Sequence, residues 1–403
     1  MLQTDPLPGR SRIGPSPRPV PYNSRESRSR KESDSRSDAR RTVRQKVVVL
    51  GAGRVGKVIA ADLSRDFEVT SADRSRDALN SLASRYQVNT RVTDLGSSEA
   101  IGDAVRDADL VVSAVPGFMG FNTLKTILSN GKDVVDISFF AEDAFALDEL
   151  ARSRNVIAAV DCGVAPGNPD FLAGFFATQM QIQDFEFMVG GLHFGRTEPD
   201  RYLPTFSPVD VWEEYTRPAR YVRDGKLITM PPLSEPELIE IHAGGHALVL
   251  EAFNTDGLRS LITTMDGRIP NMKEKTLRYP GHIAYIKELQ ETGKPWTPDT
   301  WKPGDDDDEF TIMRISFHGF ENGREKKFSY TLLAVYDKET CMSSMSRATG
   351  YTCTGVARCV LAGAYKRGGI SPPSYIGESP GCLDRIFAHL RERNIAFEKN
   401  EEL

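Results

Sequence analysis

The sequence predicts an α/β protein in which a doubly wound parallel β-sheet is followed by an α+β domain. Three observations predict this arrangement. Short apolar runs alternate with stretches of helical apolar spacing from residue 46 to about residue 160, as in a parallel sheet with crossover helices. A glycine-rich turn joins the first of these strands to the first helix. After Gly167 the rhythm ends, and the longer alternating polar and apolar runs that follow are typical of an antiparallel or mixed sheet.

The first strand and helix carry a dinucleotide-binding motif. Lys46–Leu50 is an apolar run, and it leads directly into Gly51-Ala-Gly53-Arg-Val-Gly56 at the start of a helix. Strand, G-x-G-x-x-G and helix in this order are typical of a Rossmann fold. The first glycine makes the tight turn, the second lets the backbone approach a pyrophosphate, and the third lets helix and strand pack closely. The turn therefore predicts cofactor contacts from Gly51, Gly53, Arg54, Val55 and Gly56.

The residues after the second predicted strand indicate which dinucleotide binds. That strand covers 67–72 and ends at Asp73, 17 residues after Gly56, close to the spacing at which an acidic residue holds the ribose 2′-hydroxyl. A carboxylate at this place repels a 2′-phosphate, so the sequence favours NAD. Arg74 follows directly and could pair with a 2′-phosphate, so NADP stays open.

The later strands of the predicted parallel sheet place further residues beside the cofactor. They cover 87–92, 108–115, 132–137 and 156–160, with helices at 77–86 and 97–106. Ligands of doubly wound sheets bind at the carboxyl ends of the strands. We therefore expect the nicotinamide half to lie against Ser138, the segment 161–167 and the turn 113–117, which includes Ala114, Val115 and Pro116.

The α+β part is predicted from residue 167 onward. Its expected strands cover 184–191, 217–222, 237–242, 310–317 and 326–335, and its expected helices cover 207–215 and 281–291. Ser207-Pro208 is typical of an N-cap followed by a first-turn proline. A final helix at about 343–366 has many small residues, which would suit packing back onto the nucleotide-binding sheet.

The charge is divided unevenly along the 403 residues. Residues 1–44 hold ten Arg, one Lys and five acidic residues, whereas the remainder carries a net charge of −11 within a total of −5. The basic segment is also rich in Pro and Ser, so we predict a disordered tail. It lacks the apolar run of a secretory signal, and its acidic residues are atypical of a transit peptide. The acidic remainder argues against nucleic-acid binding.

The five cysteines and the apolar pattern exclude other classes. The cysteines are scattered and odd in number, which indicates reduced thiols and a cytoplasmic protein rather than a disulfide framework. No zinc-type spacing of Cys and His occurs, so we expect no metal. No run of about 18 apolar residues occurs, so we expect no membrane span. Cys162 is interpreted as a small apolar filler, and the acidic run 305–309 as a solvated loop.

Four segments together resemble the saccharopine dehydrogenase-like oxidoreductases: 51–56, 161–167, 276–281 and 346–351. The resemblance covers about 46–380, and within the family 206–220 and 250–259 are similar to the lysine 6-dehydrogenase branch. It implies a nucleotide domain built from 45–166 and 343–403, an inserted substrate-binding and dimerisation domain at 167–342, and a homodimer. It also implies NAD(P)-linked oxidation of a carbon that bears an amine, or the reverse reduction. His193 stands where the family has proline, and this stretch could shape the substrate pocket.

Oxidation of the lysine ε-amine sets the requirements for the site. The amine, whose ordinary pKa is about 10.4, must lose a proton before hydride can leave its carbon. Candidates for the catalytic groups are Asp161, His282 and Tyr279. The substrate carboxylate calls for arginine and its α-ammonium for an acidic residue. The substrate-binding candidates are Arg278, favoured as the carboxylate clamp, with Arg217, Arg259, Glu213, Glu214, Asp256 and His193. Of the adjacent Glu213 and Glu214, we expect one to point inward and the other to be solvated.

Three functions stay open on the sequence. The leading hypothesis is oxidative deamination of the L-lysine ε-amine to allysine, which cyclises to Δ1-piperideine-6-carboxylate. The alternative within the family is a saccharopine or carboxynorspermidine-type reductase that joins an amine and an aldehyde, which would need more than one carboxylate-binding arginine. The alternative from another class is a protein that binds the dinucleotide without turnover, as a sensor or an assembly protein.

Overall fold

The structure, a computed structural model, describes residues 44–298 and 308–402. The predicted tail lies outside these residues apart from Arg44, and so do residues 305–307 of the acidic run. We expected Glu309, which ends that run, to be solvated, and it is not. It is fully buried and accepts hydrogen bonds from the backbone N–H and the hydroxyl of Ser344, both at 2.7 Å. No helix within the described ranges is long and apolar enough to cross a membrane.

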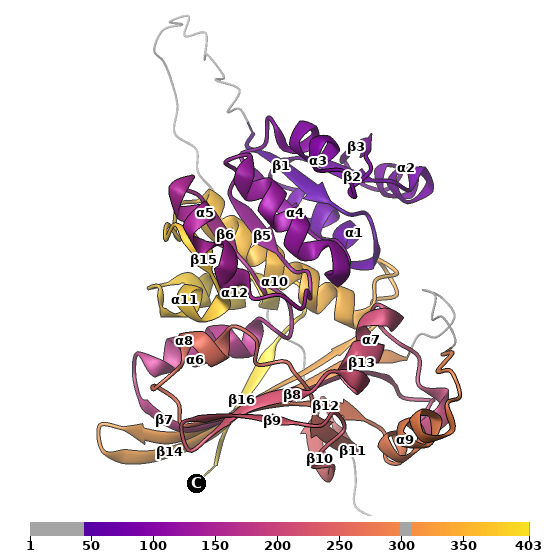
Figure 1. Cartoon of the computed structure of the whole chain (residues 1–403), viewed down its shortest axis with the longest axis vertical. Helices are drawn as coiled ribbons and strands as arrows, with labels where there is room; N and C mark the ends of the chain where they lie inside the picture. The colour runs from indigo at the N-terminus through magenta and orange to yellow at the C-terminus, as the bar shows by residue number, and fades with distance from the viewer. Residues whose placement is uncertain (1–43, 299–307, 403) are drawn as a thin grey trace, which may run out of the picture. The chain divides into compact units, whose positions relative to one another are not determined.

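Seven parallel strands form the first sheet, in the order β15-β6-β5-β4-β1-β2-β3 (Figure 1). The doubly wound α/β fold class is thereby confirmed. Six of the strands come from the first part of the chain: β1 (Lys46–Leu50), β2 (Glu68–Asp73), β3 (Asn89–Val92), β4 (Leu110–Ser113), β5 (Val134–Asp136) and β6 (Ile157–Ala159). The strand order changes direction between β1 and β4, which is the point where ligands of such sheets bind.

Helices cover both faces of this sheet because both faces are apolar. Val47 and Val49 of β1 belong to the core on the side of α1 (Arg54–Leu63), whereas Val48 and Leu50 belong to the core on the opposite side. The other helices of this half are α2 (Arg76–Ala83), α3 (Ser98–Val105), α4 (Gly117–Ser129) and α5 (Asp148–Ser153).

The end of the chain contributes to both sheets. Helix α10 (Ser344–Leu361) packs along α1, as the small residues predicted, and a Cβ on Gly350 would lie only 2.9 Å from Val58. Strand β15 (Gly369–Ser371) then adds to the parallel sheet beside β6. After α11 (Pro373–Glu378) and α12 (Cys382–Arg391), strand β16 (Phe397–Glu402) pairs with β14 in the second sheet. Neither β15 nor β16 was predicted from the sequence.

The second sheet has nine strands and is mixed, which confirms the α+β interpretation. Its main path is β10-β11-β12-β7-β13-β14-β16, with β8 beside β12 and β9 beside β8, and only the pair β12 and β7 is parallel. The strands are β7 (Gln181–His193), β8 (Ala219–Arg223), β9 (Lys226–Met230), β10 (Glu237–Ala243), β11 (His246–Asn254), β12 (Asn271–Arg278), β13 (Glu309–Glu321) and β14 (Arg324–Val335). The helices of this half are α6 (Asn168–Ala177), α7 (Pro208–Thr216), α8 (Leu261–Thr264) and α9 (His282–Thr292).

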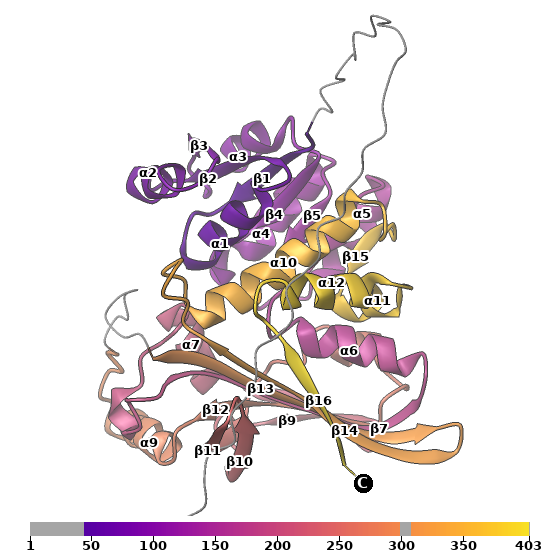
Figure 2. The same cartoon turned by 180° about the vertical axis from the view of Figure 1, so that it is seen from behind.

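One of the hydrophobic cores contains residues of both sheets. Figure 2 shows α6 lying between the second sheet and the helices α11 and α12, and these elements are in contact. The core runs without a break from Val49 through Phe171 of α6 to Phe317 of β13. Because this core fixes the second sheet beside the first, it holds α7 and β12 close to the carboxyl ends of the parallel strands.

Candidate functional site

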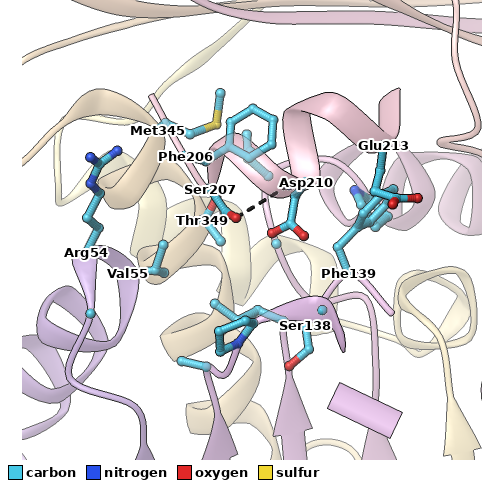
Figure 3. A pocket seen from close by; sticks show the side chains of 18 of the residues that line it. Arg54, Val55, Ser138, Phe139, Phe206, Ser207, Asp210, Glu213, Met345 and Thr349 are labelled. Carbon is cyan, nitrogen blue, oxygen red and sulfur yellow. Dashed lines mark hydrogen bonds between the residues drawn. The ribbon is translucent and has the colours of Figure 1, made fainter. Parts of the chain in front are cut away.

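A cavity of about 740 Å³ lies at the carboxyl ends of the parallel strands (Figure 3). One part is lined by the turn after β1 and by the residues that follow β2, β3, β4 and β5. The other part is lined by α7, by β7 and β12, and by the first turn of α10. All of the predicted cofactor contacts line it: Gly51, Gly53, Arg54, Val55, Gly56, Asp73, Arg74, Ala114, Val115 and Pro116.

The three glycines of the turn have the geometry that a bound pyrophosphate requires. Gly51 has φ +108°, and a Cβ there would lie 2.6 Å from the carbonyl oxygen of Ala114. A Cβ on Gly56 would lie 2.1 Å from the carbonyl oxygen of Gly51, so both positions exclude a side chain. A Cβ on Gly53 would instead meet no atom within 4 Å, because that position faces open space. The residues present therefore fit a dinucleotide whose phosphates approach the backbone at Gly53.

Asp73 is held against this turn by the backbone. Its Oδ2 accepts the N–H of Ala52 at 2.7 Å, and its Oδ1 accepts the N–H of Ser75 at 2.7 Å. Each carboxylate oxygen keeps a second lone pair that could accept a ribose hydroxyl. Arg74 also lines the cavity, beside Asp94, Leu95 and Gly96 after β3, which the sequence analysis did not single out.

Opposite changes in coenzyme preference are expected from the two residues at the end of β2. Asp73→Ala should weaken NAD binding about tenfold more than NADP binding, because it removes a hydrogen-bonding partner of the 2′-hydroxyl. Arg74→Ala should shift the ratio in the opposite direction. Calorimetric titration of both variants with each coenzyme measures the ratio, and an unchanged ratio in Asp73→Ala would contradict the ribose assignment.

Helix α7 presents one charged face to the cavity. Ser207 caps its start, where its hydroxyl accepts the N–H of Asp210 at 3.4 Å. Asp210, Glu213, Glu214 and Arg217 are spaced to share one helix face, and all four line the cavity. In Figure 3, Asp210 from α7 and Ser138 after β5 lie on opposite sides of the space, with Arg54 and Val55 towards its other end. Burial raises the pKa of Asp210.

The two adjacent acidic residues of α7 have different surroundings, as expected. Glu214 is the inward one, and burial raises its pKa although Arg278 opposes that effect. The side chain of Glu213 is 47% exposed, and its Oε2 lies 3.3 Å from Nη2 of Arg217. The guanidinium of Arg217 also lies over the ring of Phe139, 5.3 Å from its centroid.

Arg278, the favoured carboxylate clamp, lines the cavity but is already engaged within the protein. Its Nη2 donates to Glu214 Oε2 at 2.9 Å, its Nε to the hydroxyl of Tyr215 at 3.0 Å and its Nη1 to a backbone carbonyl oxygen at 2.9 Å. The guanidinium also lies over the ring of Tyr202, 4.3 Å from the centroid. The residue is 1% exposed, and its contacts to these side chains raise its pKa despite the burial that opposes this.

His282 belongs to the same buried network and does not line the cavity. Its Nδ1 lies 2.8 Å from the carbonyl oxygen of Pro199, so this nitrogen donates, and its Nε2 accepts from the hydroxyl of Tyr215 at 2.9 Å. Burial, with Arg278 adding to it, lowers its pKa to about 3. A neutral ring with both nitrogens engaged has a structural explanation, so we do not retain His282 as a proposed base.

Tyr279 and His193 also lie away from the cavity lining. The Tyr279 hydroxyl donates to the carbonyl oxygen of His193 at 3.1 Å, and burial raises the pKa of Tyr279 to about 12. His193 is buried at the end of β7. The structure thus joins these two candidates to each other and gives neither a contact with the space that a ligand would fill.

Asp161 and Asp256 are further acidic candidates that line the cavity, and each is paired with an arginine. Asp161 has φ +58° and accepts from Nε of Arg259 at 2.9 Å, while Arg259 itself lies outside the lining. Asp256 accepts from both Nε and Nη2 of Arg220, at 2.7 and 2.9 Å. Both acidic groups are therefore charge-balanced within the protein.

Glu274 is a cavity residue that the sequence analysis missed. It lies on β12 with Thr276 and Arg278 at two-residue spacing, so the three side chains share one face of the strand. Its carboxyl group is hydrogen-bonded to the hydroxyl of Thr255. Burial raises the pKa of Glu274 to about 8. The polar residues at every second position from Glu274 to Arg278 were the signal that could have identified the polar face of this strand.

The chemistry of the site involves no recognisable metal cluster. Among residues 44–298 and 308–402, no group of three or more His, Cys, Asp or Glu side chains could hold a metal ion. Cys162 is fully buried, and burial raises the pKa of its thiol far above the ordinary value. The site therefore combines a phosphate-binding turn with acidic and basic side chains.

Two family matches cover nearly all of the described chain. Residues 47–159 match the saccharopine dehydrogenase NADP binding domain, and residues 163–395 match the saccharopine dehydrogenase C-terminal domain. The two matches meet at the junction between the parallel sheet and α6.

Curated relatives are about 25% identical to the chain within the segments that align. The mitochondrial alpha-aminoadipic semialdehyde synthase of Mus musculus is 26% identical over 199 residues, which is 47% of this chain and 22% of that protein. The saccharopine dehydrogenase [NADP(+), L-glutamate-forming] of Pyricularia oryzae is 25% identical over 261 residues, 61% of this chain and 57% of that protein. The chain thus spans only part of the length of these relatives.

A solved structure shares the fold. The apo saccharopine dehydrogenase (L-Glu forming) from Saccharomyces cerevisiae superposes with a TM-score of 0.72 at 18% identity, covering 89% of this chain and 100% of that chain. At this identity the similarity shows the arrangement of the two sheets and leaves the substrate to be argued from the cavity.

Proposed function

The chain belongs to the saccharopine dehydrogenase family, and from that membership we propose that it is an NAD(P)-dependent oxidoreductase acting on a carbon–nitrogen bond of an amino acid. The open space at Gly53 and the carboxylate of Asp73 support the coenzyme part of this proposal. When bound, the nicotinamide accepts a hydride from the carbon that carries nitrogen, or returns it. The side chains of this protein have to hold the substrate and manage its protons.

The choice between substrates depends on which arginines are already paired with carboxylates of the protein. Arg220, Arg259 and Arg278 are each tied to an internal carboxylate at 2.9 Å or less. Of the other arginines in the cavity lining, Arg54 and Arg74 lie beside the glycine turn and the end of β2, and Arg217 has the weaker pairing, to a half-exposed glutamate at 3.3 Å. A substrate with several carboxylates needs several free arginines, whereas a substrate with one carboxylate and two amines needs one.

This pattern supports a diamino monocarboxylic acid, and we propose oxidative deamination of the L-lysine ε-amine to allysine. The Glu213–Arg217 pair is complementary to an amino-acid head group, because Arg217 can hold the carboxylate while Glu213 holds the α-ammonium. The ε-amine would then extend towards Ser138 and Asp161 at the ends of the parallel strands. NAD is the proposed coenzyme on account of Asp73, with NADP as the alternative.

The curated relatives favour a second candidate, oxidation of saccharopine. The relative at 25% identity is a saccharopine dehydrogenase by name. The two candidates differ in what the cavity must hold, since saccharopine carries more carboxylates than lysine. A homodimer, the domain limits at 166 and 343 and a cytoplasmic location stay predictions from the sequence.

The test is turnover with a panel of amines. Purified protein is incubated with NAD⁺ or NADP⁺ and with L-lysine, L-ornithine, cadaverine or saccharopine, and the absorbance of the reduced nicotinamide is followed. We expect reduction with L-lysine and formation of a cyclic imine. Turnover of saccharopine alone would select the second candidate, and coenzyme binding without any turnover would select the non-catalytic function.

Arg217→Ala is expected to raise the KM for L-lysine by about tenfold to 100-fold, because a charge-assisted hydrogen bond to the carboxylate is lost. The KM for cadaverine, which lacks the carboxylate, should change little. The matched variant Arg220→Ala removes an arginine tied to Asp256 and serves as the comparison. An equal loss for lysine and cadaverine in Arg217→Ala would show that Arg217 is not the clamp.

A further inference from the structure

A buried carboxylate lies directly behind the cavity wall, outside the groups considered so far. Asp136 ends β5 and is fully buried. Ser138, two residues later, lines the cavity, while its hydroxyl lies 3.2 Å from Asp136 Oδ2 and its N–H donates to Oδ1 at 2.8 Å. Ser113 also contacts this carboxylate but does not line the cavity. Ser138 is therefore the contact that connects Asp136 with the cavity.

The groups around Asp136 let it exist in two protonation states near neutral pH. Burial raises its pKa to about 7, and Asp161 at the end of β6 contributes to this rise. Asp161 is itself paired with Arg259. The thiols of Cys162 after β6 and Cys353 on α10 also lie near, and burial raises both of their pKa values far above the ordinary range, so they stay neutral.

We propose that Ser138 and Asp136 form a proton relay that serves the reacting nitrogen. This inference rests on the proposed oxidation of an amine. A substrate ammonium passes one proton to Ser138 Oγ while the Ser138 hydroxyl proton moves to Asp136 Oδ2, which leaves a neutral amine, an unchanged serine and a protonated aspartic acid. In the reductive direction the same proton returns. Asp136 acts only through Ser138, and after each oxidation it releases its proton back along the same path.

The relay predicts a pH dependence with a definite sign. Asp136 must be ionised to accept a proton, so the rate of amine oxidation should rise with pH through about 7, where its pKa lies. The rate of the reverse reaction should fall over the same range, because there the protonated form donates. If Asp136 only held the turn through the Ser138 N–H, its replacement would change the stability of the fold. The rise of the oxidation rate with pH, which we call the limb of the pH–rate profile, would then remain.

The test combines a pH–rate profile with a direct observation of the carboxyl group. Asp136→Asn and Ser138→Ala should each lower kcat by roughly 100-fold and remove the limb, with little change in KM, whereas Ser138→Thr should restore it. Asp133→Asn is the matched control, since Asp133 is a partly buried carboxylate directly before the same strand, accepts the N–H of Ile157 and lies outside the cavity lining. Infrared difference spectra between acidic and alkaline pH should show a protonated carboxyl band that Asp136→Asn lacks and Ser138→Ala shifts.

The outcomes of these experiments test the relay independently of the proposed function. An infrared titration absent from the wild type, or a pH–rate limb that persists in Asp136→Asn, overturns the relay even when lysine is oxidised. Loss of the limb together with rescue by Ser138→Thr supports it. If no amine is oxidised by the wild type, the proposed function fails, and the infrared titration with its dependence on Ser138 still decides whether Asp136 exchanges a proton with the cavity.

Discussion

Gly53→Val is expected to abolish dinucleotide binding while the protein stays folded. Gly53 has ordinary backbone angles, φ −70° and ψ −164°, and a Cβ there meets no protein atom within 4 Å. The valine side chain would instead occupy the space in which the pyrophosphate approaches the backbone. The loss of one hydrogen bond to a charged phosphate costs about 1.5 to 3 kcal/mol, so we expect a loss of affinity of roughly 100-fold or more.

Gly56→Ala provides the contrast that makes this prediction specific. A Cβ on Gly56 would lie 2.1 Å from the carbonyl oxygen of Gly51, so even alanine forces the helix away from the strand. That variant should melt at a lower temperature, whereas Gly53→Val should melt near the wild type. Calorimetric titration with NAD(H) and thermal melting followed by circular dichroism give the two readouts. Affinity retained within a few-fold in Gly53→Val would mean that the phosphates bind elsewhere.

The part of the cavity lined by the glycine turn could be predicted from the sequence because its determinants are local. The turn, the strand before it and the helix after it are contiguous in 46–63, and Asp73 follows at a spacing set by one helix and one strand. Gly51 acts through its own backbone angles, and the Asp73 carboxylate accepts N–H groups from the turn and from Ser75, two residues along the chain. Local features of this kind can be recognised in the sequence without knowledge of the tertiary contacts.

The other part of the cavity, lined by α7, β7 and β12, depends on pairings between distant segments, and less of it could be predicted from the sequence. Strand β12 was missed because its polar residues hide the apolar pattern of a strand. Glu274, Thr276 and Arg278 face the cavity, while Lys273 and Lys275 are paired with acidic residues of other strands. Likewise, Arg278 looked like a free clamp because its partner Glu214 is 64 residues away. Asp136 was read only as part of a strand, since nothing local shows that Ser138 turns back onto it.

Arg278→Ala is expected to destabilise the fold by about 3 to 5 kcal/mol, which is the usual consequence of removing one partner of a buried ion pair. The guanidinium is 1% exposed and satisfies Glu214, the Tyr215 hydroxyl and a backbone carbonyl oxygen, so its removal leaves Glu214, whose side chain is 20% exposed, without a countercharge. The deficit should also depend on pH. Burial raises the pKa of Glu214, and without Arg278 that pKa rises further. The variant should therefore lose most stability at alkaline pH and regain part of it as the solution becomes acidic enough to protonate Glu214.

A double variant separates this structural role from substrate binding. In Arg278→Met with Glu214→Gln, no buried charge is left unpaired, so most of the stability should return. If Arg278 serves the fold alone, the double variant should bind L-lysine with a KM within a few-fold of the wild type, and Arg217→Ala should show the carboxylate-dependent loss instead. If the KM of the stable double variant rises for lysine but not for cadaverine, Arg278 holds the substrate carboxylate, and the assignment of that role to Arg217 is wrong. Denaturant melts at two pH values and the two KM ratios decide between these outcomes, because one measures the ion pair and the other the ligand.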